Sequence, residues 1–271
     1  MPDLDHLSYS SISTYQMCPR SWKFRYVDKV PVKTSTALVF GSAFHDAIED
    51  YLRQRTIDTL VTDGVVAPEK PLTACWGQAW STQVERNGAD NIEWGEETPE
   101  ALSNQGLAML SDEEVIQTLN GLAPLVDGDH IHIEDYVTLS VPGVPIPVIG
   151  YIDIITEDGV PGDFKTSSRR WSSSRGDDEM QPVFYLAALN QAGYVLNPER
   201  RFRHYVFVKT KTPQMQVVQS TRTAGELLWL LDMVRSVWEG IAAEVYPMNP
   251  GTWKCSPKWC EYWSLCRGRY G

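Results

Sequence analysis

The spacing of the hydrophobic residues changes near Ile131, and this change constrains the fold more than any other feature of the sequence. Residues 131–139 alternate apolar and polar side chains, which predicts a strand with one buried face. Two more strand patterns cover 149–155 and 161–166, and turn-forming residues precede each of them. We expect the three strands to form an antiparallel meander.

Helices and a further strand pair surround this meander. Thr223 and Glu226 form a capping box, which marks the start of a long helix. Residues 56–130 have mainly helical patterns, and we expect a helical insertion that covers part of the core. The order of the elements predicts an α/β domain with a mixed sheet. The remaining expected segments are helices at 41–55, 176–193 and 223–243, and strands at 201–210 and 214–221.

The two ends of the chain have their own character. A serine cap precedes Ile12, and Pro19 can open a second helical stretch. In that stretch Trp22, Phe24 and Tyr26 alternate with basic residues, which suits stacking on unpaired bases, although core packing explains them equally well. We expect one domain, made of N-terminal helices (1–55), the insertion (56–130), the core (131–245) and an irregular tail rich in Pro, Trp and Cys (246–271).

The net charge of -11 argues at first sight against a nucleic-acid partner, because phosphate binding needs Lys and Arg. The acidic residues are concentrated, however. Residues 46–163 contain 23 acidic and 4 basic side chains, and the rest of the chain contains 12 and 20. The two ends and the stretch 165–211 can therefore offer a positive surface to phosphates.

The sharpest local motif is Asp163-Phe164-Lys165, ten residues after Asp153. In a strand, Asp163 and Lys165 project from one face while Phe164 enters the core. Asp153 stands in an apolar run, where a carboxylate is costly unless it is paired or binds a metal. Two carboxylates beside a lysine suit phosphodiester cleavage with Mg²⁺, although a same-face ion pair and a turn acid explain the motif equally well.

Two helical motifs add to this pattern. Gly41, His45 and Glu49 recur every four residues, so they share one helix face on which His45 can bind a metal and the small Gly41 permits close backbone approach. Taken alone, a histidine paired with Glu49 is the simpler interpretation. Gln181 and Tyr185 have the same spacing and can contact a phosphate or a base, or can simply form the polar edge of an amphipathic helix.

Taken in order, the motifs resemble the RecB-type branch of the PD-(D/E)xK nuclease superfamily. They are GxxxHxxxE at 41–49, GxxD at 150–153, DFK at 163–165 and QxxxY at 181–185, and the opening segment with its Cys-Pro-Arg is similar as well. The resemblance implies a restriction-endonuclease-like core. It also implies Mg²⁺ or Mn²⁺ ligands at His45, Asp153, Asp163 and the Phe164 carbonyl, a catalytic Lys165, and DNA contacts from Gln181 and Tyr185. Glu134 is a weaker candidate that we leave out of the metal set.

Four of the five cysteines lie at the two ends of the chain. We expect the fifth, Cys75, to be a buried apolar side chain. Iron–sulfur members of this family, such as AddB-type and four-cysteine CRISPR-associated nucleases, use one cysteine before the core and three after it. The resemblance therefore implies a [4Fe–4S] clasp, although the tail spacing C-x4-C-x5-C departs from the usual C-x2-C-x5-C. Structural Zn²⁺ is the alternative. The ligands would be Cys18, Cys255, Cys260 and Cys266.

The activity implied is that of a stand-alone phage or mobile-element exonuclease. It would act on DNA ends, with single-stranded DNA as the expected substrate, in recombination, repair or end processing. A phosphate-binding loop of the form GxxxxGK(S/T) is missing, so we expect no fused helicase motor. A structure-specific endonuclease and a DNA-end-binding subunit of a helicase or integration complex are the alternatives. No apolar run approaches the ~20 residues that cross a bilayer, so we expect a cytoplasmic protein without a membrane partner.

Overall fold

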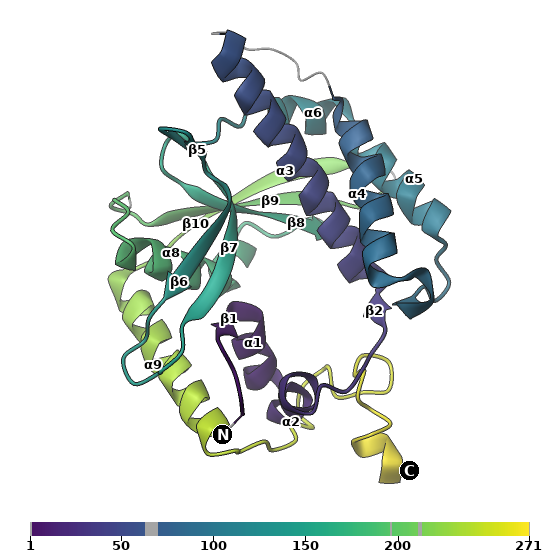
Figure 1. Cartoon of the computed structure of the whole chain (residues 1–271), viewed down its shortest axis with the longest axis vertical. Helices are drawn as coiled ribbons and strands as arrows, with labels where there is room; N and C mark the ends of the chain where they lie inside the picture. The colour runs from purple at the N-terminus through teal and green to yellow at the C-terminus, as the bar shows by residue number, and fades with distance from the viewer. Residues whose placement is uncertain (1, 63–69, 196, 211–212, 271) are drawn as a thin grey trace.

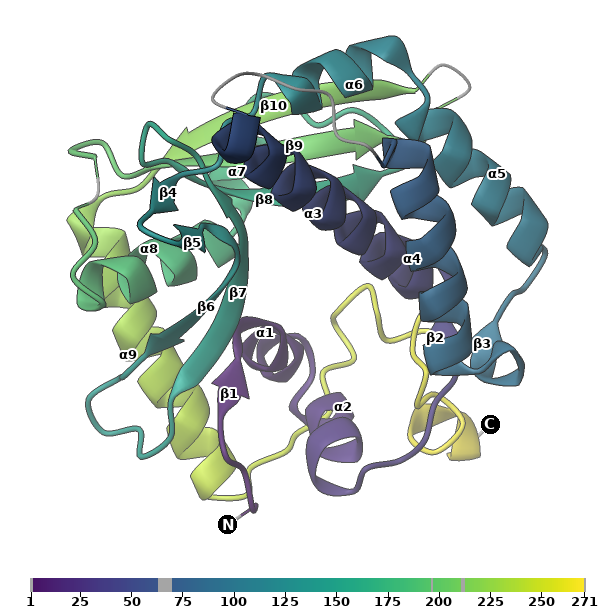
Figure 2. The same cartoon turned by 45° about the horizontal axis from the view of Figure 1, so that its top comes forward.

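The chain folds around a twisted mixed sheet with helices on both faces (Figure 1). We describe it from a computed structural model that covers residues 2–62, 70–195, 197–210 and 213–270. The N-terminal helices and the C-terminal segment lie on the same side of the sheet in both views (Figures 1 and 2). None of the helices in these ranges has the length and apolar character needed to cross a membrane.

The central sheet of the described ranges has six strands, in the order β1-β7-β8-β9-β10, with β6 beside β7. The predicted meander is confirmed, since β6–β7 and β7–β8 are antiparallel, and so is the predicted pair β9–β10. β8 and β9 run parallel, because the helical segment between them carries the chain back to the same end of the sheet. The strands are β1 (Leu7–Ser8), β6 (Ile133–Leu139), β7 (Val148–Ile155), β8 (Pro161–Ser167), β9 (Arg201–Val208) and β10 (Gln214–Thr221).

Strand β7 is shared by three neighbours, and this arrangement shapes the site. β6 pairs along almost all of one edge of β7. On the other edge, β1 pairs with the start of β7 at Val148 and Ile149, and β8 pairs with its end at Ile154 and Ile155. Within the described strands, the middle of this edge therefore separates from its neighbours. Asp153 lies at the point where β7 and β8 part.

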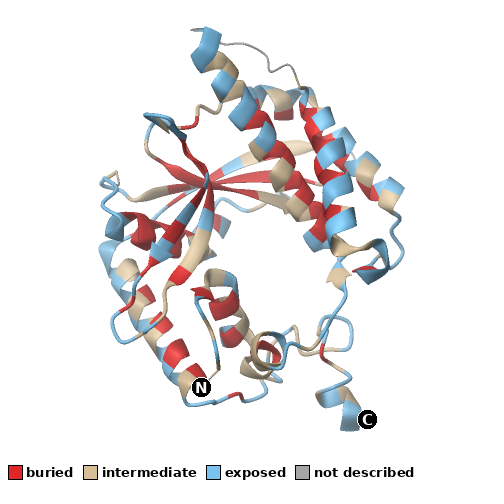
Figure 3. Cartoon of the chain, viewed as in Figure 1, coloured by how far each residue is buried: buried red, intermediate tan, exposed pale blue. Residues whose placement is uncertain are grey.

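Two hydrophobic cores cover the two faces of the sheet (Figure 3). On one face, Phe164 and Phe207 pack against four helices, three of which belong to the predicted insertion. On the other face, Ile152 and Phe202 pack against α8 and α9. The first set is α3 (Thr36–Thr62), α4 (Leu72–Asn87), α5 (Pro99–Leu110) and α6 (Glu113–Asn120), and the second is α8 (Gln181–Gln191) and α9 (Ala224–Ala242).

Several predicted boundaries were wrong. α3 is longer than the expected 41–55, because Gly41 lies inside the helix without interrupting it. The helix expected at 176–193 is divided into α7 (Arg175–Asp178) and α8, and Pro182 stands in the first turn of α8, where a missing N–H has no cost. The capping box of Thr223 and Glu226 is confirmed. The pair Asp63-Gly64, whose sequence predicts a turn, lies outside the described residues.

Short strands lie within the predicted insertion and next to it. β2 (Thr34–Ser35) pairs in parallel with β3 (Ile92–Glu93), which follows the 3-10 turn η2 (Ala89–Asn91). β4 (Val126–Asp127) and β5 (His130–Ile131) form a small hairpin before β6. Strands of two residues are too short to show an alternating pattern, so the sequence does not reveal them.

The two ends of the chain pack against each other. The Tyr15 hydroxyl donates to the Val245 carbonyl at 2.7 Å, and the Asn249 amide donates to the Met17 carbonyl at 2.9 Å. The Trp22 ring stacks on Tyr246 at 5.8 Å. The N-terminal segment comprises α1 (Tyr9–Met17), α2 (Pro19–Trp22) and a π-helical turn η1 (Lys23–Val27), and the tail ends in a 3-10 turn η3 (Arg267–Tyr270). The expectation of an otherwise irregular tail is confirmed for the described residues.

Candidate active site

Asp153 is held beside β8 by the backbone of that strand. The carboxylate is buried, and its Oδ2 accepts a hydrogen bond from the Phe164 N–H at 2.6 Å. Burial opposes its ionisation, but His45, Lys165 and the Phe164 N–H together keep the pKa of Asp153 below its ordinary value. The separation of β7 from β8 thus creates a place where a buried carboxylate stays ionised.

Asp163 and Lys165 project from the same side of β8, as the alternation of a strand requires. Lys165 Nζ donates to Asp163 Oδ1 at 2.9 Å and lies 2.6 Å from Oδ2. Phe164, between them, is fully buried in the opposite core. Burial raises the pKa of Asp163 to about 6, although the ammonium group acts in the other direction. Burial acts against the Lys165 ammonium, but Asp163 outweighs it and raises the pKa of Lys165.

His45 reaches this pair of strands from α3. Its Nδ1 lies 3.3 Å from Asp153 Oδ2. Burial disfavours the imidazolium, yet the Asp153 carboxylate raises the pKa of His45 to about 9. The sequence left two interpretations of His45, a metal ligand or a partner of Glu49. The contact with Asp153 favours the first, because it turns His45 toward the carboxylates. Gly41, in contrast, is not required for close packing, because a Cβ there would meet no described atom within 4 Å.

Two glutamates complete the acidic group, and neither was assigned to the metal set from the sequence. Glu49 lies with His45 and Asp153 so that one ligand atom of each falls within 4.8 Å of the others. Its carboxyl is hydrogen-bonded to Glu134, and burial together with this contact raises the pKa of Glu49 to about 9. Glu134 has a positive φ of 56°, which is uncommon outside glycine and is often found at functional sites.

The register between β6 and β7 explains why Glu134 lies at the site. Ile133 pairs with Ile154 and Asp135 pairs with Ile152, so Glu134 stands opposite Asp153. Glu49 was visible in the helical motif, but the sequence could not show that it faces another carboxyl group rather than His45.

Lys165 is also held from α8. Its Nζ donates to Gln181 Oε1 at 2.9 Å, and Gln181 Nε2 donates to the Tyr185 hydroxyl at 2.8 Å. Tyr185 is buried, so its hydroxyl acts on Lys165 through Gln181. Gly150 makes this helix position possible, because a Cβ there would lie 2.6 Å from the Phe184 ring. The GxxD and QxxxY motifs are thereby linked through the packing of β7 on α8.

The residues of this site fit a hard divalent cation. Carboxylate oxygens with a single imidazole suit Mg²⁺ or Mn²⁺ better than a soft metal. Asp163 Oδ2 is buried, and its ion-pair partner among the described residues is Lys165 Nζ at 2.6 Å. Glu49 and Glu134 share a hydrogen bond, which two carboxyl groups form when one keeps its proton. A cation bound to Glu49 would take the place of that shared proton.

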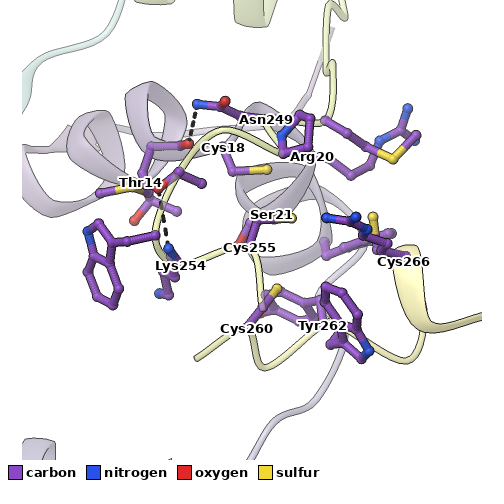
Figure 4. A pocket seen from close by; sticks show the side chains of 18 of the residues that line it. Thr14, Cys18, Arg20, Ser21, Asn249, Lys254, Cys255, Cys260, Tyr262 and Cys266 are labelled. Atoms are coloured by element: carbon purple, nitrogen blue, oxygen red, sulfur yellow. Dashed lines mark hydrogen bonds between the residues drawn. The ribbon is translucent and has the colours of Figure 1, made fainter. Parts of the chain in front are cut away.

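The four terminal cysteines line one cavity of about 620 Å³ between the N-terminal helices and the tail (Figure 4). Cys18 comes from the junction of α1 and α2, and the other three come from the tail. Within the described chain, no three of their sulfur atoms gather within 4.8 Å of one another. Phe24 and Tyr262 pack together at 5.4 Å in the same cavity lining. Cys75 is buried in the α3 core, as predicted.

Stacking of DNA bases on Trp22 is excluded in this conformation. Trp22 is completely buried between Tyr15, Tyr26 and Tyr246. Of the two interpretations of the aromatic N-terminal segment, core packing is therefore correct for this residue. The sequence predicted that Trp22 lies in a helical segment. It could not show that Tyr246 from the C-terminal tail covers the Trp22 ring.

A mixed sheet that presents buried carboxylates and a lysine, with a histidine from α3 beside them, is the arrangement expected of a phosphodiesterase site of the nuclease type. The comparison with known families agrees: the model of the PD-(D/E)XK nuclease superfamily matches residues 6–267, and the chain belongs to that superfamily.

Comparison with solved structures supports the fold. A crystal structure from Eubacterium rectale, of a protein described as a candidate exonuclease, superposes with a TM-score of 0.53 at 14% identity. The match covers 97% of this chain and 88% of the other. No curated protein sequence matches the chain.

Proposed function

We propose that the protein is a Mg²⁺- or Mn²⁺-dependent exonuclease that hydrolyses phosphodiester bonds at the ends of single-stranded DNA. The observation that carries this proposal is the convergence of His45, Asp153 and Lys165, from α3, β7 and β8, around Asp163. An exonuclease is also how the superposed Eubacterium rectale protein is described. We place this activity in recombination or DNA end processing, where free single-stranded ends arise.

Each side chain has a defined task in this proposal. His45, Asp153 and Asp163, with Glu49 and the Phe164 carbonyl, would hold the cation, which makes hydroxide accessible and neutralises the scissile phosphate. Lys165 keeps its proton beside Asp163 and places an ammonium group where negative charge develops on the phosphate. Gln181 fixes the Lys165 amine and is less buried than Tyr185, so the direct DNA contact falls to Gln181.

The exposed arginines that follow β8 support a DNA substrate. Arg169 and Arg170 are both exposed a few residues beyond Lys165. Guanidinium groups bind phosphate oxygens and add affinity without sequence preference. Part of the charge of the acidic stretch 46–163 is gathered at the carboxylates that would bind the metal.

We also infer that Cys18, Cys255, Cys260 and Cys266 hold an iron–sulfur cluster, as in the RecB-type branch. A zinc ion places its four thiolates about 3.8 Å apart, given zinc–sulfur distances of about 2.3 Å. An iron–sulfide cube stands between its ligands and therefore holds them farther apart than a single zinc ion does. The placement of one cysteine before the core and three after it is what favours the cluster. The cluster would join the two ends of the chain and so stabilise the fold.

The proposal is tested with two single-stranded DNA substrates, one linear and end-labelled and one circular. We expect Mn²⁺-dependent loss of the linear DNA and an intact circle. Cleavage of the circle would identify an endonuclease. Binding of DNA ends without cleavage of either substrate would support the assembly subunit and contradict the enzyme.

A further inference from the structure

A second group of metal-ligating side chains lies outside the nuclease site. His130, His132 and Asp135 each offer one ligand atom, and the three atoms fall within 4.8 Å of one another. The group sits where the β4–β5 hairpin joins β6. We propose that these three residues form a binding site for a divalent transition metal of the zinc type.

Both oxygens of Asp135 face an imidazole nitrogen. His130 Nε2 lies 2.8 Å from Oδ1, and His132 Nδ1 lies 2.5 Å from Oδ2. The two imidazole rings are perpendicular, with their centres 4.6 Å apart. Two imidazole nitrogens and a carboxylate therefore face one another, which is the donor set of a zinc site with three protein ligands. Zinc takes such ligands at about 2.0–2.2 Å and separates them by about 3.3 Å, so the contacts of 2.5 and 2.8 Å would lengthen around the ion.

The burial of Asp135 and His132 favours a bound cation, because a buried carboxylate needs positive charge beside it. Asp135 and His132 have side chains that are 8% and 4% exposed. A carboxylate that leaves water needs compensating positive charge, and the ion-pair partners of Asp135 among the described residues are these two histidines. Neutral imidazole with a carboxylate is a donor set that zinc and related metals prefer to Mg²⁺. The metal would supply the missing charge without requiring protonated histidines.

The fourth coordination position is open. The His130 side chain is 60% exposed, so solvent reaches the group from this side. On the other side, the Tyr194 hydroxyl lies 3.3 Å from His132 Nδ1, beside a cavity of about 350 Å³ lined also by Leu189 and Gly159. Water can complete the tetrahedron, as it does in zinc sites with three protein ligands.

This site is separate from the nuclease carboxylates. In the β6–β7 ladder Asp135 pairs with Ile152, and the next residue of β7, Asp153, projects from the other face. The bound metal would tie the hairpin and the segment of Tyr194 to β6. Its role is therefore to fix the strand that carries Glu134, and it does not depend on the proposed DNA cleavage.

The test is a zinc titration of the full-length protein, stripped with a chelator and then supplied with excess Mg²⁺ to occupy the carboxylate site. His130→Gln is the informative variant because His130 is exposed and its loss leaves the fold intact. His6→Gln, another exposed histidine, is the matched control. We expect the native chain and His6→Gln to retain one more zinc per chain than His130→Gln. We also expect the variant to bind that zinc more than about 100-fold more weakly.

Cobalt(II) provides a second measurement that separates this site from the cysteines. The native-minus-variant spectrum should contain d–d bands without thiolate-to-cobalt charge transfer, because the ligands are nitrogen and oxygen. Asp135→Asn should give the same difference. Equal zinc content in the native chain and His130→Gln would overturn the proposal, as would a difference spectrum without d–d bands. The group would then be a hydrogen-bonded histidine–aspartate network only.

Discussion

The Nδ1 atom of His45 lies 3.3 Å from Oδ2 of Asp153, so α3 and the end of β7 meet at a charged contact. The same Asp153 oxygen accepts the Phe164 N–H from β8. Helix α3 and the two consecutive strands β7 and β8 are thus joined at one carboxylate. A change in any of them alters the geometry of the nuclease site.

Tyr185→Phe tests whether Tyr185 positions Lys165 or touches DNA. The variant removes the hydroxyl that accepts from Gln181 and leaves the ring in place. Loss of one hydrogen bond corresponds to about 1 kcal/mol, so we expect kcat to fall about 5-fold with KM for DNA unchanged. Tyr136→Phe, on the exposed face of β6, should leave both constants unaltered. A higher KM with an unchanged kcat would instead assign Tyr185 to DNA binding.

Glu49→Gln tests the carboxylate that the sequence did not assign to the metal set. The substitution preserves the shape of the side chain and removes one anionic ligand. We expect the Mn²⁺ concentration for half-maximal cleavage to rise about 10- to 100-fold. Glu85→Gln on the exposed face of α4 is the control. An unchanged Mn²⁺ requirement in Glu49→Gln would remove Glu49 from the metal site.

Cys260→Ala tests the iron–sulfur clasp. In anaerobically purified protein we expect loss of the broad visible absorption and of iron, and a fall in Tm of more than about 5 °C, because cluster binding adds to folding free energy. Cys75→Ala removes a buried thiol far from the cavity and should keep the iron. A colourless native protein that contains zinc would favour the structural zinc site.

His204 gives a prediction for the pH dependence of stability. It is completely buried beside Trp171 and Phe202, and neither ring nitrogen has a hydrogen-bond partner in the described chain. Burial lowers the pKa of His204 to about 3, against about 6.5 in the unfolded chain. The unfolded state therefore binds more protons between these values, and stability falls as the pH falls below about 6.5.

The loss attributable to His204 is at most about 1.4 kcal/mol per pH unit in that interval. The free energy of unfolding in urea is measured at pH 7.5 and at pH 5.5, for the native chain and for His204→Leu. Subtracting the change in the variant from the change in the native chain cancels the contribution of the other titrating groups. The variant should lose less stability than the native chain over the same interval. Parallel losses would show that His204 can be protonated in the folded state.

The sequence predicted the elements whose patterns repeat over several residues. β6 and β10 alternate buried and exposed side chains over at least five residues, and the capping box of Thr223 marks the start of α9. The parallel pairing of β8 with β9 is not encoded in either strand alone, since it depends on how α8 packs over Gly150. Two-residue strands such as β1 leave no pattern to read.

For the site, the sequence supplied the donors but not all of their partners. His45, Asp153 and Lys165 were recognisable from the order of the motifs and the family resemblance that the motifs carry. The contact between Glu49 and Glu134 requires α3 to cross the sheet at β6, and no local pattern specifies that crossing. The pairing of the ends was indicated by the cysteines, whereas the burial of Trp22 under Tyr246 became visible only in three dimensions.

The central claim is that the carboxylate–lysine pair of β8 cleaves DNA. Its most direct test is the single-turnover rate on end-labelled DNA with saturating Mn²⁺, for the native chain, Asp163→Asn, Lys165→Met and the control Asp158→Asn. Asp158 lies in the turn between β7 and β8 and pairs with Arg203 at 2.6 Å. We expect both site variants to be slower than the native chain by more than about 100-fold and Asp158→Asn to be close to native. Native rates in Asp163→Asn and Lys165→Met would contradict the account.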